Sequence, residues 1–486
     1  MIVGIDVGTS GLKAVVVGDD LAVRGQGRRA YGVAYPRPGW AEQDPRLWEA
    51  ALAPAIADAL AEAGVGAATV RGIGVVGQLD GCVAVGADGA ALAPCLIWMD
   101  RRAETEIAAI PAKTVRERAG VVLDATHMAA KIAWLRVALG GNAACYHQPV
   151  SYLVSRLTGV DVFDHGLAST TMLYAPRERD FDPALLDLFA IERRLLPAIA
   201  DADAVAGPLT TAGAALTGLA AGIPVAVGTG DDFANPLGAG LTAPGRVVCC
   251  LGTAEVVGAL HPEPLVDARA LVETHGYPGG LYFIENPGWL AGGAIDWFVA
   301  TFGLVDAAAL DRLAAATPPG ADGVIFLPAL SGAMAPEWVA GARGCFYGLS
   351  PAHGAGHMAR AVLEGCAFAM RDVIERLAEM GVAHERVLLV GGGSESPLWA
   401  HIRADVSGLP VEIAARADTA PIAAAMLAAV AAGVVPDVAA AAARVAGPGT
   451  VIEPTPEGRR AGDAAHARYR RLFESLRPMF DDGLAP

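Results

Sequence analysis

The stretch VAVGTGDDFANPLGAG, residues 225–240, organises the rest of the chain. An apolar run, residues 223–227, breaks at the glycine-containing turn 228–230, and Asp231 and Asp232 follow at once. This order predicts a buried strand, a tight turn and a helix that presents two carboxylates at its start. In an open α/β sheet, such an acid faces the crevice in which ligands bind. The alternative is that one of the two aspartates only caps the helix.

A second pattern occurs twice, once in each half of the chain. Residues 2–17, IVGIDVGTSGLKAVVV, predict a β-hairpin whose turn is Gly8-Thr9-Ser10-Gly11. Residues 246–260 repeat strand, turn and strand around Gly252-Thr253. Each turn offers backbone N–H groups and a threonine hydroxyl, which suit phosphate oxygens.

Length and composition predict a large folded protein. The 486 residues are long enough for two domains, which we place at residues 1–240 and 241–486. A hydrophobic fraction of 53% supports a sizeable core, because disordered chains combine low hydrophobicity with high charge. The repeated hairpin then predicts an α/β fold of two related domains with a cleft between them.

The charge pattern argues against nucleic acid as a partner. The formal net charge is −16, and the lysines are confined to Lys13, Lys113 and Lys131, with no basic run. The longest apolar run, residues 421–435, is too short to span a membrane comfortably. The seven cysteines form no CxxC pair and the first residues contain no basic signal region, so we expect a cytoplasmic protein in a reducing compartment.

Polar residues follow two predicted strands of the first half. Gln78 and Asp80 come after one strand, and Asp100 and Arg101 come after the next but one. Side chains at such positions can hold a polyhydroxylated ligand. For each of them the alternative is a turn residue whose hydrogen bonds are satisfied locally.

Asp6, Lys13 and a triple glycine are candidates for a phosphate site. Asp6 lies inside an apolar strand, where an acid is costly unless it has a partner or a ligand, although it could also face solvent at the strand end. Lys13 either adds positive charge to the turn or points to solvent. Gly391-Gly392-Gly393 lie between a buried strand and a helix that Ser396 can cap, an arrangement compatible with an anion. A lone glycine-rich turn does not establish a nucleotide site.

Taken together, these segments resemble the FGGY family of carbohydrate kinases over nearly the whole chain, and within it most closely the xylulokinases. The resemblance rests on six segments in the family's order: GIDVGTSGLK, VVGQLDG with PCLIWMDRRA, GTGDDFANPLGAG, LGTAE, LPALSGAMAPEWVAGARGCFYGLSPAHGAGHMARAVLEG and GGGSESPLWAHIRADVSGLPVE. It implies two actin/hexokinase-like (ribonuclease H-like) domains, which agrees with the repeated hairpin.

The resemblance also implies roles for single residues. Asp231 matches the aspartate that accepts the proton from the attacking sugar hydroxyl, and whether Asp232 assists stays open. Asp6 matches the aspartate that supports the Mg²⁺–phosphate end of ATP through water, and Asp231 is a second candidate for contact with the metal. The implied sugar contacts are Gln78, Leu79, Asp80, Asp100, Arg101 and Asp231. The implied ATP contacts are Gly8, Thr9, Ser10, Lys13, Gly252, Thr253, Gly391, Gly392 and Gly393.

One position departs from the family's pattern. Xylulokinases usually carry Met-His where this chain has Leu79-Asp80, so a carboxylate replaces an imidazole and the hydrogen-bond roles differ. We therefore expect an ATP-dependent sugar kinase that acts on a ketopentose, first of all D-xylulose, giving D-xylulose 5-phosphate. Another ketose or a sugar alcohol, such as ribulose, ribitol or glycerol, is the alternative substrate.

Two alternatives come from other functional classes. One is an ATPase or regulator of the same fold without sugar transfer, and the other is a sugar-binding protein without catalysis. The segment from Gln78 to Arg101 favours the kinase, since the first alternative does not need a sugar site. The implied partners are a small sugar and ATP with Mg²⁺, and the resemblance is compatible with a homodimer.

Overall fold

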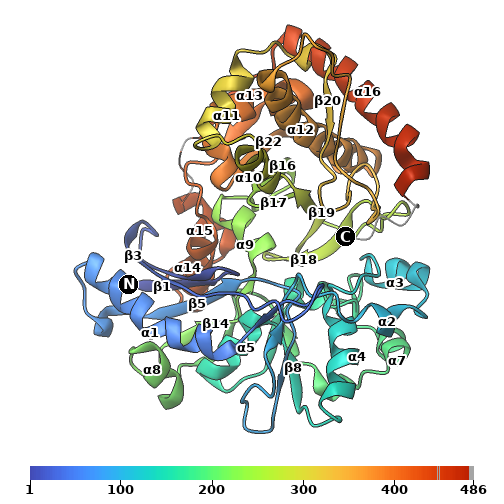
Figure 1. Cartoon of the computed structure of the whole chain (residues 1–486). Coiled ribbons are helices and arrows are strands. Elements are labelled where there is room, and N and C mark those ends of the chain that lie inside the picture. The colour runs from blue at the N-terminus through green and yellow to red at the C-terminus, as the bar shows by residue number, and fades with distance from the viewer. Residues whose placement is uncertain (446, 448, 481–486) are drawn as a thin grey trace.

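The computed structural model describes residues 1–445, 447 and 449–480, and it consists of two halves that are each built on a mixed β-sheet (Figure 1). The strands of the first sheet, in spatial order, are β13 (Val205–Pro208), β14 (Pro224–Ala226), β5 (Gly72–Gly77), β1 (Ile2–Val7), β2 (Gly11–Val17) and β3 (Val23–Ala30), and β15 (Thr229–Gly230) also pairs with β5. Those of the second sheet are β18 (Glu273–Tyr277), β19 (Leu281–Leu290), β17 (Ala254–His261), β16 (Gly245–Leu251), β22 (His384–Val390), β23 (Val411–Ile413) and β24 (Thr450–Ile452).

The two sheets have the same topology at their centres. In the first half β3, β2 and β1 are antiparallel neighbours, and β5 and then β14 continue the sheet in parallel with β1. In the second half β19, β17 and β16 are antiparallel, and β22 and β23 continue in parallel with β16. The repeated hairpin of the sequence therefore opens each of two related folds, and the predicted α/β class is confirmed.

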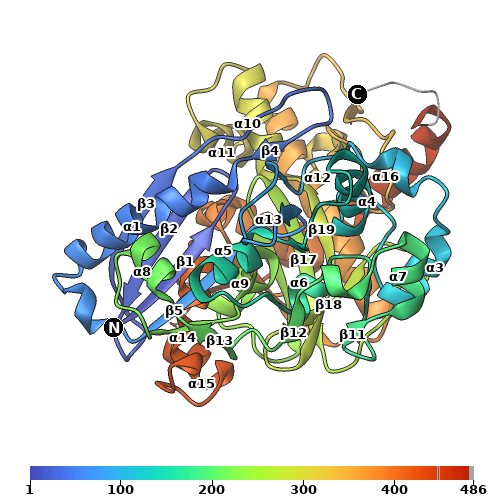
Figure 2. The ribbon, with the colours of Figure 1, turned by 90° about the horizontal axis from the view of Figure 1, so that it is seen from below.

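Helices cover the sheets of both halves (Figures 1 and 2). Those of the first half are α1 (Pro45–Glu62), α2 (Glu104–Ile107), α3 (Ala112–Ala119), α4 (Met128–Ala138), α5 (Pro149–Thr158), α6 (His165–Ser169), α7 (Pro183–Phe189), α8 (Thr211–Thr217) and α9 (Asp231–Gly238). Those of the second half are α10 (Gly292–Thr301), α11 (Ala307–Ala315), α12 (Ala355–Glu379), α13 (Pro397–Ser407), α14 (Ala420–Ala431), α15 (Val438–Val445) and α16 (Pro456–Phe480). Among the described residues, none of these helices is both long and apolar enough to cross a membrane.

Local signals in the sequence set several of these boundaries. The Ser396 side chain accepts a hydrogen bond from the backbone N–H of Trp399, and Pro397 is the first residue of α13, as the sequence predicts. The same helix ends at Gly408, which adopts the left-handed conformation that glycine tolerates best. Ser396 thus fixes where α13 begins, shortly after the glycine turn that follows β22, and Gly408 fixes where it ends.

Helix α14 joins the two halves, although it belongs to the second half in sequence. It packs against β1, β5 and α9 of the first half, and Figures 1 and 2 both place it against that sheet. Close approach is possible because Gly4 of β1 and Gly74 of β5 are paired neighbours: a Cβ on either would overlap the α14 backbone, at Pro421 O and Ala424 O respectively. A third apolar core, shared by both halves, forms around α14.

The sequence pattern of residues 126–218 predicts mainly helices, and this prediction is wrong in part. Besides helices, this segment contains the short strands β8 (Cys145–His147), β9 (Val162–Asp164), β10 (Tyr174–Ala175), β11 (Asp180–Phe181), β12 (Ala198–Ala200) and β13. Two of these pair far along the chain, β8 with β6 (Val83–Val85) and β9 with β12, so the local pattern of the sequence does not reveal them. The other short strands form three further pairs, β10 with β11, β4 (Glu42–Gln43) with β7 (Cys95–Leu96) and β20 (Ile325–Leu327) with β21 (Cys345–Tyr347).

The last helix also differs from expectation. Residues 455–486 are predicted to form a helix that packs across the domain junction, and α16 is helical as predicted, while residues 481–486 lie outside the described part of the chain. Helix α16 packs against α12, α13 and β20, all within the second half. Its buried face, which includes Tyr469 and Phe473, joins the core of that half.

Gly74→Val tests whether the glycines of the sheet are needed for α14 to pack closely against it. The added side chain has to displace the α14 backbone, so the free energy of unfolding should fall by about 1–3 kcal/mol, the usual effect of overpacking. Urea denaturation followed by circular dichroism measures this change. Gly32→Val is the matched control, because Gly32 is exposed and no atom lies within 4 Å of the added Cβ. Equal stability of the two variants would contradict this role of Gly74.

Candidate active site

The predicted acids meet at one edge of the first sheet. Strands β1, β5 and β15 run parallel, with Asp6 paired to Val76 and Gly230 paired to Gly77. Their carboxyl ends therefore lie side by side, and Gln78 and Asp231 follow directly after β5 and β15. This edge is where open α/β sheets bind ligands.

Asp231 is the first residue of α9 and lies at the centre of this edge. Gly230 occupies the N-cap position and α9 has no side-chain cap, so neither aspartate serves as the N-cap. The pKa of Asp231 is raised to about 6, first by burial among protein atoms and in addition by the charge of Asp80. Asp231 and Asp232 are nevertheless partly exposed to solvent.

Asp6 faces Asp231 from β1 and is not a solvent-exposed strand end. Its side chain is buried, and its pKa is raised to about 7 by burial first and by the charge of Asp231 second. Its Oδ1 atom has no hydrogen-bond partner among the described residues. The Lys13 ammonium lies 3.9 Å from Asp6 Oδ2 and 2.8 Å from Asp418 Oδ1, so Lys13 reaches across to the second half of the chain.

The first glycine turn is held rigidly beside these acids. The backbone N–H of Gly8 donates to Gly11 O at 3.1 Å, and the Tyr31 hydroxyl donates to Gly8 O at 2.8 Å. The carbonyl of Thr9 accepts a hydrogen bond from Gln43 Nε2 at 2.6 Å. Gln78 in turn donates to Gln43 Oε1 at 2.7 Å. The turn that contains Ser10 is thus tied to the segment that carries the predicted sugar contacts.

The predicted nucleotide turns of the second half lie next to each other. Strands β16 and β22 are parallel neighbours, with Cys250 paired to Val390, so Gly252-Thr253 and Gly391–Gly393 follow adjacent strand ends. Gly391 has φ +89°, and a Cβ there would lie 2.6 Å from Leu251 O, so the turn requires glycine. Gly252, Thr253 and Gly392 are exposed, although the Gly252 N–H itself donates to Ala254 O at 2.9 Å.

Asp80, whose charge acts on Asp231, is fixed by contacts of its backbone. Its backbone has φ +59°, a left-handed conformation that aspartate tolerates better than most residues. The Asp80 N–H donates to Gln148 Oε1 at 2.8 Å, and the buried Lys131 ammonium donates to Asp80 O at 2.6 Å. Leu79 packs against Gly230, where a Cβ would come within 2.7 Å of it.

Four residues that the sequence analysis did not single out extend this site. The buried His127 lies between Asp80 and Glu273 of β18, with Nδ1 3.2 Å from Asp80 Oδ1 and Nε2 3.5 Å from Glu273 Oε1. His275 Nε2 lies 3.4 Å from Glu273 Oε2 and 3.5 Å from Glu285 Oε1. No local motif marks these residues, although isolated acids and histidines inside apolar strand patterns are a weak signal.

Asp100 and Arg101 already have protein partners. Asp100 is buried, accepts a hydrogen bond from Ala41 N at 2.7 Å and pairs with Arg102 at 2.7 Å. Arg101 binds Asp124 through both terminal nitrogens and Glu104 through Nε. These pairs hold the loop after β7, and a direct contact of either residue with a sugar stays a prediction.

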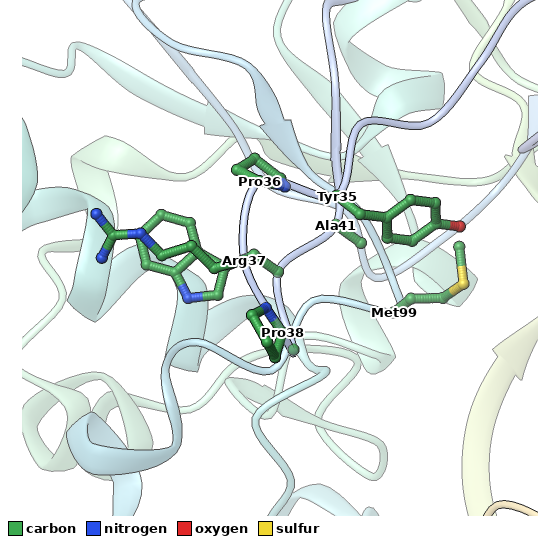
Figure 3. Close-up of a pocket in the computed structure, with 8 residues that line it drawn as sticks. Tyr35, Pro36, Arg37, Pro38, Ala41 and Met99 are labelled. Carbon is green, nitrogen blue, oxygen red and sulfur yellow. The ribbon is translucent and has the colours of Figure 1, made fainter. Parts of the chain in front are cut away.

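A surface concavity of about 440 Å³ lies beside this loop and is lined by Tyr35–Ala41 and Met99 (Figure 3). Tyr35 and Met99 lie on one side of it, and Arg37 lies on the other with its guanidinium carbon 4.8 Å from the Trp40 ring centroid. None of the predicted site residues lines this concavity. It is therefore distinct from the site around Asp231.

Comparisons with known proteins place the chain among carbohydrate kinases. Residues 1–238 match the N-terminal domain of the FGGY family of carbohydrate kinases, and residues 247–432 match the C-terminal domain. The chain is 33% identical to a glycerol kinase of Gloeobacter violaceus over 85% of this chain and 84% of the relative, and 30% identical to the xylulose kinase of Escherichia coli over 87% and 88%. The crystal structure of xylulose kinase from Rhodospirillum rubrum superimposes with a TM-score of 0.90 at 30% identity, covering 98% of this chain and 99% of that one.

Glu273→Gln tests the ionic contact between the two halves. Burial works against the charge of Glu273, but His127 and His275 outweigh it and lower the pKa to about 2, so the carboxylate is ionised at neutral pH. The neutral amide leaves the His127 imidazolium without one buried partner, and the free energy of unfolding should fall by about 3 kcal/mol. Urea denaturation at pH 7 measures the change, with the exposed Glu263→Gln as control. A loss no larger than that of the control would contradict the assignment.

Proposed function

The chain belongs to the FGGY family of carbohydrate kinases, and we propose that it transfers the terminal phosphoryl group of ATP to a hydroxyl of a small sugar held beside Asp231. The observation that carries this proposal is the position of Asp231. The charge of Asp231 raises the pKa of Asp6, which lies next to the predicted phosphate turn Gly8–Gly11. The charge of Asp80, a predicted sugar contact, in turn raises the pKa of Asp231. The Asp231 carboxylate thus interacts with one residue of each predicted ligand site.

The proposed step is an in-line displacement at the terminal phosphorus. The sugar oxygen forms the new P–O bond, the bond from phosphorus to the oxygen of ADP breaks, and Asp231 takes the proton of the attacking hydroxyl. The neighbouring turns at Gly252-Thr253 and Gly391–Gly393, which are at least partly exposed, would hold the phosphates of the nucleotide. Positioning of both reactants beside Asp231 supplies much of the rate, since little covalent chemistry falls to the protein.

The residues around Asp6 fit a magnesium ion that accompanies ATP. Asp6 Oδ1 is buried without a hydrogen-bond partner among the described residues, and carboxylate oxygen is a preferred ligand of Mg²⁺. A cation there would also relieve the repulsion between Asp6 and Asp231. When bound, Mg²⁺ neutralises charge on the phosphates, and Asp6, directly or through water, would hold it on the phosphate side.

As the substrate we propose a ketopentose, D-xylulose first, giving D-xylulose 5-phosphate. The xylulose kinases of Escherichia coli and Rhodospirillum rubrum support this choice at 30% identity over most of the chain. A polyol such as glycerol is the second candidate, because glycerol kinases are equally similar and because Asp80 offers a carboxylate where xylulokinases usually have histidine. A carboxylate accepts from two hydroxyls, whereas a neutral imidazole accepts from one.

Asp231→Asn tests the proposed base. Asparagine keeps the size of the side chain but cannot take the proton, so kcat should fall about 10²–10⁴-fold with little change in KM for ATP. The measurement is coupled ADP release over a panel of ketoses and polyols. Asp232→Asn is the matched control, and a smaller loss in that variant is expected because Asp232 lies one position further into α9.

Three outcomes would contradict the proposal. Hydrolysis of ATP that needs no sugar and survives Asp231→Asn would favour an ATPase or regulator of the same fold. Sugar binding without ADP release in the unmodified protein would favour a binding protein without catalysis. A loss in Asp232→Asn as large as that in Asp231→Asn would remove the special role of Asp231.

The pH profile of kcat/KM gives a separate test. Asp231 accepts a proton only as a carboxylate, and its raised pKa of about 6 means that the acid form accumulates below that value. Asp6 must also be ionised, and its pKa is about 7 in the ligand-free protein. Activity should therefore be low at pH 5, rise between about pH 6 and 7, and level off above. A flat profile from pH 5 to 8 would count against both assignments.

A further inference from the structure

A cluster of three different metal-ligand side chains lies in the first half of the chain, outside the predicted ATP and sugar contacts. It consists of Cys145 and His147 of β8 and of Asp161, which lies between α5 and β9. The cysteine sulfur, one ring nitrogen and one carboxylate oxygen all lie within 4.8 Å of one another. Cys145 and His147 are two positions apart on a strand, so their side chains leave the same face of β8.

His147 presents a ring nitrogen that the protein itself does not bind. The side chain is 0% exposed, and its Nε2 atom has no hydrogen-bond partner among the described residues. Nδ1 lies 3.1 Å from Ser151 Oγ, whose hydroxyl donates to Gln148 O. This network assigns the hydrogen of a neutral imidazole to Nδ1, which leaves a lone pair at Nε2. A hydrogen bond from the other ring nitrogen is also what orients most metal-binding histidines.

Asp161 lies at the distance from His147 that a shared ion requires. Its Oδ1 atom is 3.3 Å from His147 Nε2, and no hydrogen bond joins the two. Nitrogen and oxygen ligands at about 2.0–2.1 Å from one tetrahedral zinc ion are themselves about 3.3 Å apart. Ser155 Oγ donates to Asp161 Oδ1 at 2.7 Å and holds the carboxylate in place. The Asp161 side chain is 49% exposed, so an ion can enter from solvent beside it.

Cys145 supplies a third ligand as its thiolate. The residue is 6% exposed, and burial raises the pKa of the thiol to about 12, so the sulfur carries a proton at neutral pH. An ion that binds there displaces this proton to solvent as the metal–sulfur bond forms. The charge of Arg193 acts against burial and favours the thiolate.

Another group among the described residues, Asp372, Glu375 and His466 of the second half, is less suited to a cation. Arg470 donates to Asp372 Oδ1 at 2.7 Å, and His466 Nε2 lies 2.9 Å from the same oxygen. The guanidinium therefore already compensates the charge of that carboxylate. This group also offers no sulfur, so the two clusters can be told apart by a signal that only a thiolate gives.

We propose that Cys145, His147 and Asp161 bind one Zn²⁺ ion, with water as the fourth ligand on the exposed side of Asp161. A set of one sulfur, one nitrogen and one oxygen suits Zn²⁺, whereas Mg²⁺ and Ca²⁺ take oxygen ligands. The ion would join β8 to the segment between α5 and β9, next to Gln148, whose side chain accepts a hydrogen bond from the N–H of Asp80. The proposal is independent of the proposed function, and its test uses no sugar phosphorylation.

A cobalt(II) titration tests the site, because Co²⁺ is a spectroscopic substitute for Zn²⁺. The reduced full chain is freed of metal with a chelator that is then removed, and Co²⁺ is added in excess Mg²⁺, which occupies sites built of oxygen alone. We expect one Co²⁺ per chain with visible bands of a four-coordinate ion and a thiolate-to-cobalt band in the near ultraviolet. One equivalent of Zn²⁺ should abolish these bands and raise Tm, since an ion that binds only the folded protein stabilises it.

Two variants assign the ligands. Cys145→Ser removes the sulfur, so the thiolate band should disappear, whereas it should persist in Cys345→Ser, the control in the partly exposed cysteine of β21. Asp161→Asn removes a charged oxygen ligand at an exposed position, and the Kd for Zn²⁺ should rise at least about 10-fold, because the loss of even an outer partner of a metal ligand costs that much. Asp187→Asn, exposed on α7, is its control.

Three results would overturn the proposal. The first is the absence of a thiolate band in the unmodified protein. The second is a band that survives in Cys145→Ser or is lost in Cys345→Ser, since another cysteine would then bind the ion. The third is an unchanged Kd for Zn²⁺ in Asp161→Asn, measured by competition with a chromophoric chelator. Circular dichroism verifies the fold of each variant beforehand, and the exposed Asp161→Asn decides the matter if Cys145→Ser does not fold.

Discussion

The partial burial of the Asp231 carboxylate near the charged side chains of Asp6 and Asp80 is the constraint on which the site depends. The carboxylate follows a strand that pairs with β5, so the sheet fixes its position before any ligand binds. Burial and the charge of Asp80 keep its pKa near 6, which is close to the value that suits a proton acceptor at neutral pH. The cost of this arrangement is offset by the rigid surroundings: Gly8–Gly11 on one side and the Asp80 turn on the other.

The two related halves explain how a nucleotide and a sugar can be brought to one carboxylate. Each half begins with a hairpin whose turn contains Gly-Thr, and a later parallel strand ends beside the first strand of that hairpin and brings a further loop next to the turn. Helix α14 packs on the paired glycines of β1 and β5 and makes the sheet of the first half part of a core shared with the second. Charged contacts across the halves, such as Lys13 with Asp418 and His127 with Glu273, then act on a framework that apolar packing has already set.

The sequence predicts the parts of the site that rest on local patterns. The strand–turn–helix around Asp231, the repeated hairpins and the Ser396 cap are written in consecutive residues, and the structure confirms their positions. His127, Glu273 and Glu285 could not be found this way, because they meet only when α4, β18 and β19 come together. The same reason accounts for β8 and β9, which pair with distant strands, and for α16, whose apolar face does not say which half it covers.

The most direct test of the central claim is a crystal structure with a non-hydrolysable ATP analogue and D-xylulose bound together. We predict that one sugar hydroxyl lies within about 2.6–3.2 Å of the Asp231 carboxylate, with the terminal phosphorus of the nucleotide on its far side. If both ligands were bound and the hydroxyl nearest to that phosphorus were held by another residue, with Asp231 out of hydrogen-bond reach, the assignment of Asp231 as the proton acceptor would be wrong.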